Sequence, residues 1–473
     1  MNPLNNWLPI LQTWRGRQFA PSEWEAAVLC VSANESIDPK LLAEQLLQHN
    51  YISRQDGVIQ IVRRTWYGKK RIDYRCNRCG NEYQQYFQTT PCASCNSPHC
   101  IYCEHCLQMG RTKQCTPLLM ISQKNVPPMP NEHNLLPFPN VLLTPNQQAG
   151  ANFIFDHIQT GGECLLWAVT GAGKTEMLFP LIHRMLCEAK SLLIATPRKD
   201  VVIELGPRLR KAFGSDKIVE LYGGCQDPWA GAPITLATTH QLIRFREAFD
   251  VVIVDECDAF PYKDNETLQR LVRRSLVEKG LIVWLTATPP KELIKKQKAI
   301  FQVTSRFHGF LMPIPKRLAN SNKSVSQHVL DILSKSIARG ACVFFFVPEV
   351  KMVTHVMQIL RDALGQIDKI DGTFAADPKR SEKIQRFRDR SIRILVTTSI
   401  LERGITLPMA DVVIWHADHR LFDEASLVQM AGRAGRSVED AQQASVWFVS
   451  ETFTDAQRGA IRQLKAMNSV TSA

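Results

Sequence analysis

The sequence predicts an α/β protein with two parallel-sheet domains in tandem, preceded by a small module that combines helices with a cysteine cluster. From about residue 141, short apolar runs such as CLLWAV and DVVIVDE alternate with longer helical patterns, and the alternation resumes after about residue 313. Strands that alternate with helices form parallel sheets covered on both faces. Ahead of them, eight of the fourteen cysteines fall between Cys76 and Cys115.

We expect four segments along the chain of 473 residues. Residues 1–70 carry helical patterns such as DPKLLAEQLLQ and a basic stretch, residues 71–125 hold the cysteine cluster, and residues 126–312 and 313–473 form the two α/β domains. The polar, proline-rich run NVPPMPNEHNLLPFPN predicts a linker before the first α/β domain. The basic run WYGKKRIDYRCNRC contains three aromatic residues, a composition that suits contact with DNA or protein as well as a solvated face.

Composition narrows the classes of function. The net charge of +12 suits a polyanionic partner. Because no run of eighteen apolar residues is present, we expect no transmembrane helix, and the first residues lack the pattern of a signal peptide. Clustered cysteines in such a chain indicate metal ligands rather than disulfides.

The segment AVTGAGKTE predicts a loop that binds a nucleoside triphosphate. It follows an apolar run and precedes a helical pattern, the strand–turn–helix context in which backbone N–H groups cradle phosphate. We expect these loop contacts at Thr170, Gly171 and Gly173. Lys174 would reach the β- and γ-phosphates of ATP, and the Thr175 hydroxyl would bind Mg²⁺.

Two carboxylates follow the apolar run DVVIV. Asp255, at the end of this predicted strand, would hold Mg²⁺ through water, and Glu256 would orient and deprotonate the attacking water. Thr286 and Thr288 come after the run LIVW, where their hydroxyls could link the nucleotide site to a substrate groove.

The second α/β block carries arginines in QMAGRAGR. Arg433 and Arg436 would reach across a cleft to the γ-phosphate, because a guanidinium binds phosphate oxygens in bidentate fashion. Such an arginine accelerates hydrolysis about a thousandfold or more. The glycines beside them allow close approach of the backbone.

Further contacts are expected from loops in both blocks. Arg198, Thr239 and Thr398 suit contacts to the sugar-phosphate backbone of DNA. Gly404 suits a tight loop near the nucleotide. Gln147, about twenty residues before the phosphate loop, could pair with the donor and the acceptor on the adenine edge.

Taken in order, these motifs resemble those of superfamily two helicases and translocases over residues from about 140 to 470. The resemblance implies two RecA-like domains with ATP in the cleft between them and nucleic acid across the top of both. It also implies that hydrolysis opens and closes the cleft and so moves the strand along. Thr406 departs from the pattern, since many members carry an aspartate after the arginine–glycine pair.

The cysteine cluster has the spacing of zinc knuckles, in which paired C-x2-C motifs supply tetrahedral ligands. It predicts one zinc ion and has ligands for two, with the pairing open and with His99 and His105 as substitutes. An iron–sulfur cluster is the alternative. The candidate ligands are Cys76, Cys79, Cys92, Cys95, Cys100, Cys103, Cys106 and Cys115.

With this module before the motor, the runs CIYCEHCLQMGR, VDECDAFPY and QMAGRAGRS resemble the ComFA family of late-competence ATPases. The resemblance implies an ATP-dependent translocase, stimulated by single-stranded DNA, that drives uptake of transforming DNA in natural competence. It implies ComFC, DprA and the membrane channel ComEC as partners, and a cytoplasmic location, peripheral at the inner face of the cell membrane.

The same resemblance implies how the zinc ligands pair. One site would be formed by Cys76, Cys79, Cys103 and Cys106, and the second by Cys92, Cys95, Cys100 and Cys115.

Two other functions compete with this one. A PriA-like DNA helicase for replication restart or repair has a similar motor, but PriA chains are longer and carry cysteines within the second half of the motor. A zinc-bearing DNA clamp with a silent nucleotide site is the non-enzymatic alternative, and the presence of Lys174, Glu256 and Arg436 argues against it.

Overall fold

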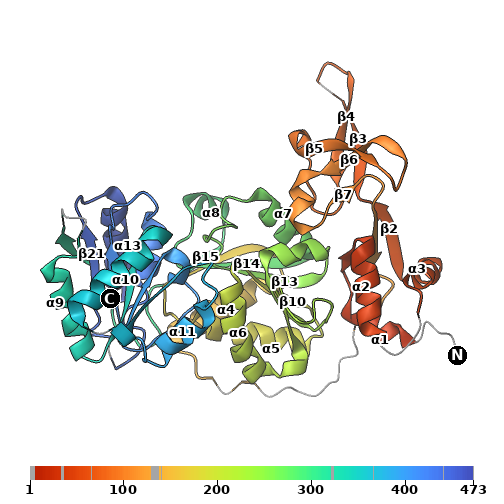
Figure 1. The fold of residues 1–473 in the computed structure, drawn as a ribbon. Coiled ribbons are helices and arrows are strands. Elements are labelled where there is room, and N and C mark those ends of the chain that lie inside the picture. The colour runs from red at the N-terminus through yellow and green to blue at the C-terminus, as the bar shows by residue number, and fades with distance from the viewer. Residues whose placement is uncertain are drawn as a thin grey trace.

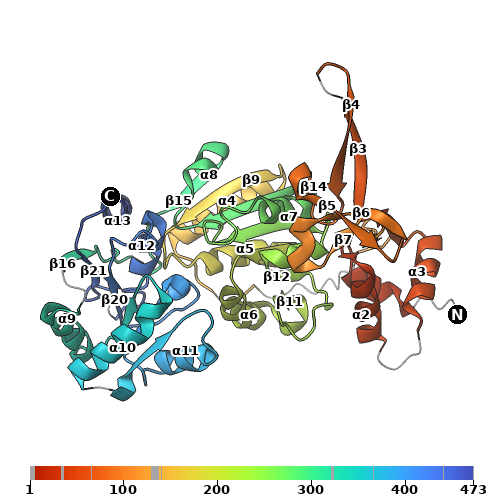
Figure 2. The same cartoon turned by 45° about the horizontal axis from the view of Figure 1, so that its top comes forward.

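The computed structural model describes residues 6–32, 37–64, 66–128, 138–139, 141–320, 324–365, 367–439 and 441–471. Most of the expected linker, residues 125–140, lies outside these ranges. Three parts follow one another in the chain and in space: an N-terminal module, a first α/β domain and a second α/β domain (Figure 1). The N-terminal module lies against the first domain, on the side away from the second domain (Figure 2).

The N-terminal module begins with helices packed on a small antiparallel sheet of order β1-β8-β2. Buried tryptophans fill its core, and Trp229 of the first α/β domain belongs to the same cluster. The indole N–H of Trp14 donates to the Trp229 carbonyl at 2.8 Å, which seats the module on that domain. The elements are α1 (Leu8–Thr13), α2 (Pro21–Val31), α3 (Pro39–Gln48), β1 (Gln18–Phe19), β2 (Ile52–Asp56) and β8 (Pro117–Ile121).

After Gln48 the structure differs from the helical expectation for residues 1–70, because strands follow. The run VIQIV is rich in β-branched residues, which favour a strand. β3 (Val58–Arg64) and β4 (Lys70–Cys76) pair as an antiparallel hairpin, so the expected boundary after residue 70 falls at the start of β4. A second small sheet has the order β5-β6-β7. Its strands are β5 (Phe87–Cys92), β6 (Ser97–Cys103) and β7 (Thr112–Lys113).

The first α/β domain is a seven-stranded sheet of order β11-β12-β10-β13-β14-β9-β15, and all its neighbouring strands are parallel. Its strands are β9 (Gly162–Ala168), β10 (Leu192–Thr196), β11 (Ile218–Leu221), β12 (Ile234–Thr238), β13 (Phe249–Asp255), β14 (Leu276–Thr286) and β15 (Ile300–Val303). Its helices are α4 (Pro145–Ile158), α5 (Lys174–Cys187), α6 (Lys199–Phe213), α7 (Glu266–Ser275) and α8 (Lys291–Lys296).

The second α/β domain is a six-stranded parallel sheet of order β16-β21-β20-β17-β19-β18. Its strands are β16 (Lys316–Ala319), β17 (Cys342–Phe346), β18 (Ile370–Thr373), β19 (Ile394–Thr397), β20 (Ala410–Trp415) and β21 (Val446–Ser450). Its helices are α9 (Gln327–Ala338), α10 (Val350–Leu364), α11 (Arg380–Arg388), α12 (Glu424–Ala431) and α13 (Asp455–Thr471).

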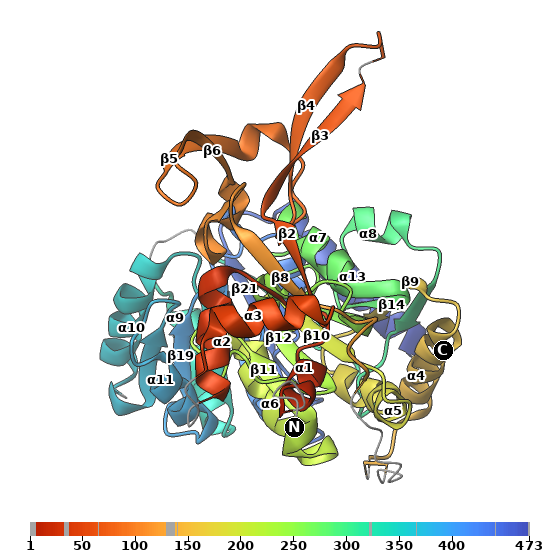
Figure 3. The same ribbon diagram turned by 90° about the vertical axis from the view of Figure 1, so that its right-hand side faces the viewer.

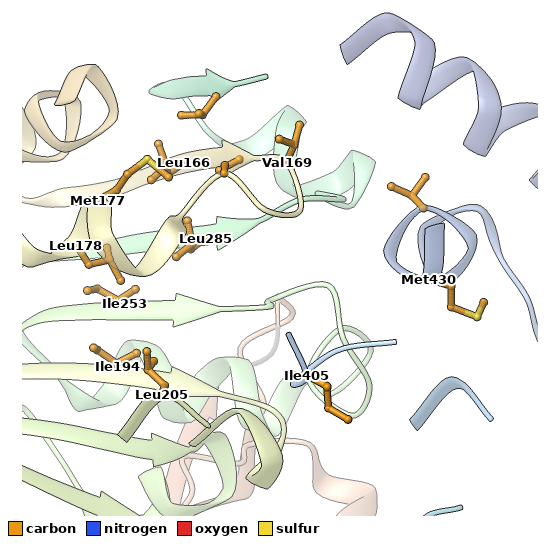
Figure 4. Close-up of a cluster of buried hydrophobic side chains, with 14 of the residues drawn as sticks. Leu166, Val169, Met177, Leu178, Ile194, Leu205, Ile253, Leu285, Ile405 and Met430 are labelled. Carbon is orange, nitrogen blue, oxygen red and sulfur yellow. The ribbon is translucent and has the colours of Figure 1, made fainter. Parts of the chain in front are cut away.

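One cluster of buried apolar side chains runs through both α/β domains. Figure 4 shows members of this cluster from both domains, among them Val169 beside the phosphate loop and Ile405 and Met430 of the second domain. The predicted fold class, two tandem parallel-sheet domains after a small cysteine-bearing module, is confirmed. Among the described residues, every helix is too short or too polar to span a bilayer.

Candidate functional sites

The loop between β9 and α5 has the geometry that phosphate binding needs. Gly171 and Gly173 adopt φ values of +83° and +75°, which glycine reaches at little cost. Gly173 is the N-cap of α5, so the first N–H groups of this helix, beginning at Lys174, have no acceptor within the helix. A helix N-terminus of this kind favours an anion.

The carboxyl end of β13 places two carboxylates beside this loop. Burial raises the pKa of Asp255 to about 6, although the charge of Lys174 acts to lower it. Glu256 adopts φ +57°, a left-handed conformation that is strained for a residue with a side chain. One of its buried carboxylate oxygens has no hydrogen-bond partner among the described residues. The same oxygen lies 3.8 Å from a terminal nitrogen of Arg403, an ion pair longer than a hydrogen bond, so the carboxylate can still accept a hydrogen bond from a ligand.

One cleft of about 600 Å³ brings together every residue expected to bind or hydrolyse ATP. The first domain contributes one wall and the second domain the other. The expected residues in its lining are Gln147, Thr170, Gly171, Gly173, Lys174, Thr175, Asp255, Glu256, Gly404, Arg433 and Arg436.

Of the two arginines that the second domain places in this cleft, Arg433 is buried and Arg436 is half-buried. Burial lowers the pKa of Arg433 well below its ordinary value and that of Arg436 to about 10, so Arg436 still carries its charge at neutral pH. Arg433 donates from Nε to the Glu402 carbonyl at 2.8 Å and also to the Ile405 carbonyl. The Gly432 backbone lies close against the Thr170 side chain, since a Cβ on Gly432 would lie 2.1 Å from the Thr170 hydroxyl oxygen.

Sequence reasoning missed an ionic link across the cleft. Arg403 donates through both terminal nitrogens to the Asp258 carboxylate, with one distance of 3.1 Å. Burial alone would raise the pKa of Asp258, but the Arg403 charge outweighs it and holds that pKa below its usual range. The hydroxyl of Thr286 donates to Asp258 at 2.5 Å, and so does that of Thr288. Two short runs of the sequence could have pointed to this ionic link: DECD, which ends in Asp258, and LERG, which contains Arg403.

Arg306 is a second residue that the sequence did not single out. It follows β15, is buried, and donates to the carbonyls of Ala434 at 2.8 Å and of Gly435. Its side chain also lies against Gly171, where an added Cβ would meet it at 3.5 Å. Arg306 therefore connects the phosphate loop with the arginine motif of the second domain.

Gln147 supports the phosphate loop in this structure. Its amide N–H donates to the Ala172 carbonyl at 2.9 Å, and its amide oxygen accepts from the Thr144 N–H at 2.9 Å. Thr406, the departure from the superfamily pattern, donates its hydroxyl across the cleft to the Glu204 carboxylate at 3.3 Å.

The donor set of the cleft fits a nucleoside triphosphate with Mg²⁺. A helix N-terminus, one lysine and three arginines line the cleft together with the partly buried carboxylates of Asp255 and Glu256. The Thr170 hydroxyl and one Glu256 oxygen are buried without a hydrogen-bond partner among the described residues. Polar atoms of this kind are rarely left unpaired unless a ligand or water completes them.

The three residues expected to contact DNA lie in different surroundings. Arg198 forms an ion pair with Glu402 of the second domain at 2.7 Å and is largely buried. Thr239 is fully buried at the start of the 3-10 helix Thr239–Arg244. Thr398 is half-buried and precedes the 3-10 helix Ser399–Leu401, whose Ile400 carbonyl accepts from Arg198 at 3.3 Å.

The eight clustered cysteines fall into two groups of four, each with its sulfur atoms within 4.8 Å of one another. The first group is Cys76, Cys79, Cys103 and Cys106, and the second is Cys92, Cys95, Cys100 and Cys115. Neither His99 nor His105 belongs to a group.

The sulfur separations fit zinc. In the first group, Cys76 and Cys106 are 3.7 Å apart at Sγ, and Cys79 and Cys103 are 3.6 Å apart. In the second group, Cys115 lies 3.7 Å from Cys92. Four sulfurs bound tetrahedrally at about 2.3 Å lie about 3.8 Å apart. The thiolate set and its spacing are therefore compatible with zinc in both groups.

Comparison with known families supports the description of both the cysteine-bearing module and the two α/β domains. Residues 28–120 match the competence protein ComFA N-terminal domain, residues 140–291 match the type III restriction enzyme res subunit, and residues 324–438 match the helicase conserved C-terminal domain. The chain is 36% identical to competence protein ComFA of Bacillus subtilis over 446 residues, which cover 91% of each chain.

The chain belongs to the ComFA family. Competence protein ComFA of Streptococcus pneumoniae is also similar, at 34% identity over 78% of this chain and 85% of that one. The predicted resemblance is thus confirmed. This ComFA family member is an ATP-hydrolysing, DNA-dependent enzyme of the helicase and translocase class with a role in competence.

Solved helicases share the fold of this ComFA family member. Mss116p, bound to single-stranded RNA and AMP-PNP, matches with a TM-score of 0.52 and 18% identity, over 65% of this chain and 69% of that one. The Lhr helicase of Mycobacterium smegmatis, bound to single-stranded DNA and AMP-PNP, matches with a TM-score of 0.50 and 20% identity, over 69% and 48%. These likenesses establish the two RecA-like domains.

Proposed function

We propose that this protein is an ATP-dependent translocase that moves along single-stranded DNA and drives uptake of transforming DNA in natural competence. One observation carries the proposal: the nucleotide cleft has catalytic groups on both walls, with Lys174 and Glu256 in the first domain and Arg436 in the second. Hydrolysis then requires the two domains to be closed. A motor needs this dependence to convert a chemical step into movement.

Each group in the cleft has one task in this proposal. The N–H groups of the glycine loop and Lys174 bind phosphate oxygens, and Thr175 and Asp255 hold Mg²⁺. Glu256 orients the attacking water and takes its proton. Arg433 and Arg436 neutralise charge that develops on the phosphate oxygens. ATP supplies the phosphoryl group that is transferred to water.

The remaining assignments extend the same proposal. Both cysteine groups bind Zn²⁺. Gln147 reads the adenine while it holds the loop, and Gly404 closes the cleft over the nucleotide. Arg198, Thr239 and Thr398 contact the DNA backbone once the cleft rearranges. The division of the chain into residues 1–70, 71–125, 126–312 and 313–473 is part of the same proposal.

The proposed place of work follows from family membership. The protein acts peripherally at the cytoplasmic face of the cell membrane, where it pulls DNA that enters through the ComEC channel. ComFC and DprA are its proposed partners when the DNA strand is passed on. Pull-down of ComFC and DprA by the purified full chain tests these partners.

The proposal is tested with purified full-length protein, by measuring ATP hydrolysis with and without single-stranded DNA and displacement of streptavidin from biotin-labelled single strands. We expect stimulation by DNA and directional displacement. Lys174→Ala should abolish both while DNA binding remains, and Lys211→Ala, exposed on α6 of the same domain, should change neither.

Two outcomes would overturn the proposal. Robust unwinding of a forked duplex would indicate a PriA-like helicase. Absence of hydrolysis by the wild-type protein in the presence of single-stranded DNA would indicate a clamp.

A further inference from the structure

The hairpin formed by β3 and β4 stands clear of the rest of the molecule in every view (Figures 1, 2 and 3). Each of its strands has seven residues, which project about 20 Å. Trp66 and Tyr67 lie at its tip, with 93% and 65% of their surface exposed. Their rings meet edge to face with centroids 5.0 Å apart. A fully exposed tryptophan is costly unless a partner covers it.

The strand register places an apolar pair and a basic pair on one face of the hairpin. Val62 lies opposite Ile72, and both are more than half exposed. One step closer to the tip, Arg64 lies opposite Lys70. Since alternate residues share a face, these four side chains form a continuous stripe that leads to the aromatic tip.

The charges of this stripe are available to a partner. On the other face, Arg63 and Arg71 are neutralised by Asp73, which lies 2.6 Å from Arg71. Arg64 and Lys70 form no ion pair with any residue that the structure describes. The stripe therefore presents unneutralised positive charge beside exposed aromatic rings, the composition of a surface that binds single-stranded nucleic acid.

The root of the hairpin is fixed to the motor. β4 ends at Cys76, the first ligand of the first cysteine group. The carbonyls of Asn77 and Arg78 accept hydrogen bonds from Arg274 of α7, and the Gly80 carbonyl accepts from Arg270 at 3.0 Å. Through this anchor the hairpin moves with the first α/β domain. The anchoring helix, α7, follows β13, the strand that ends in Asp255.

We propose that the β3–β4 hairpin is a second binding site for single-stranded DNA, in which Trp66 and Tyr67 stack on bases while Arg64 and Lys70 hold phosphates. The proposal rests on the translocase function and adds to it a contact outside the two RecA-like domains. DNA is favoured over a lipid surface because the unpaired charges lie along the strand, behind the aromatic tip, where a phosphate backbone passes. Each phosphate neutralised in this way makes binding depend on salt.

The test uses the full chain and a fluorescein-labelled oligo(dT). We expect the Trp66→Ala/Tyr67→Ala variant to bind at least about tenfold more weakly, because each of two stacked bases contributes about a fivefold effect or more. The Trp66→Phe variant should restore most of the affinity. The wild-type protein should lose tryptophan fluorescence on binding, and the Trp66→Phe variant should lose much less.

A second variant tests the charges. Arg64→Ala/Lys70→Ala should lower the slope of log Kd against log salt by about 1.4, since each phosphate contact on a single strand contributes about 0.7. Lys40→Ala/Lys211→Ala removes two exposed lysines elsewhere and should leave the slope unchanged. Zinc content and circular dichroism equal to wild type show that each variant is folded.

Three outcomes would overturn the hairpin site. Equal DNA affinity of the aromatic variant and the wild type is the first. The second is loss of binding to phosphatidylglycerol vesicles in that variant while its DNA affinity stays, which assigns the hairpin to a membrane surface. The third is a wild type that neither binds single-stranded DNA nor is stimulated by it, and only this one overturns the translocase proposal as well.

Discussion

The two cysteine groups have the same ligands but different surroundings. All four cysteines of the first group are buried, whereas the second group has one exposed cysteine, Cys95, and a half-buried one, Cys115. β6 serves both groups, since it carries Cys100 for the second and Cys103 for the first. The two groups therefore differ in burial, although both consist of four cysteines.

In the described part of the chain, hydrogen bonds from α7 join the segment around the first group to the helicase domain. Arg274 of α7 lies beside this group, and burial lowers the pKa of this arginine to about 10 while the nearby thiolates act to raise it. A zinc ion with four thiolates carries a net negative charge, which a buried arginine balances. The second group has Lys113 as its cation, at 3.2 Å from Cys92, within the β5-β6-β7 sheet itself. The first group thus connects the N-terminal module to the helicase domain, and the second stabilises the β5-β6-β7 sheet.

The largest effect should follow loss of the first group. Cys79→Ser removes one buried ligand, and structural zinc contributes about 10–16 kcal/mol of apparent binding energy to small domains. We expect the variant to lose one of two zinc ions by elemental analysis, to expose residues 52–121 to protease, and to lose DNA stimulation of ATP hydrolysis. Two retained zinc ions would exclude Cys79 as a ligand.

Loss of the second group should stay local. Cys95→Ser also removes one proposed zinc ligand, but this side chain is exposed, unlike the four buried cysteines of the first group. We expect one zinc ion to be lost while the thermal transition of the two α/β domains and the basal ATP hydrolysis stay at wild-type values. A collapse of the motor as complete as that of Cys79→Ser would show that the two groups are not separable.

Much of the motor could be predicted because its chemistry is local in sequence. The glycine loop, the acidic end of β13 and the arginine motif each occupy a short run after a strand or in a helix, and parallel sheets bring such ends to one edge. The edge strands β11, β15, β16 and β18 were missed, since four residues give a weak periodic signal.

The links between segments could not be predicted in this way. Arg403 meets Asp258, and Arg306 meets Gly435, only because the two domains close on each other. The β3–β4 hairpin was not predicted, because the expected boundary after residue 70 divides it between the helical and basic segment and the cysteine-rich segment. Ligand pairing of the cysteines needed the family resemblance, since spacing alone allows several combinations.

The coupling of the first group to the motor can be weakened without touching zinc. Arg274→Ala removes the donor to the carbonyls of Asn77 and Arg78 and to Gln18, at 2.9 Å. Leaving buried acceptors without a charged donor costs about 3 kcal/mol, so we expect a corresponding fall in the free energy of unfolding by urea, with both zinc ions retained.

Arg273→Ala, the next residue on α7, is the matched control. Its side chain is half exposed and pairs with Glu163 at 3.2 Å. Surface pairs of this kind contribute less than about 1 kcal/mol. Equal destabilisation by the two substitutions would contradict a special role for Arg274.

The smallest effect should come from a single hydrogen bond at the same junction. Thr267 of α7 lies 2.7 Å from Nδ1 of His105, next to the ligand Cys106, and is nearly buried. Thr267→Val keeps the shape and removes the bond, which should cost about 1 kcal/mol of unfolding free energy, while Thr267→Ser should cost less. Because the bond joins α7 to the first group alone, the cost should vanish in the Cys79→Ser background and persist in the Cys95→Ser background. An equal cost in both backgrounds would show that this junction does not depend on the first group.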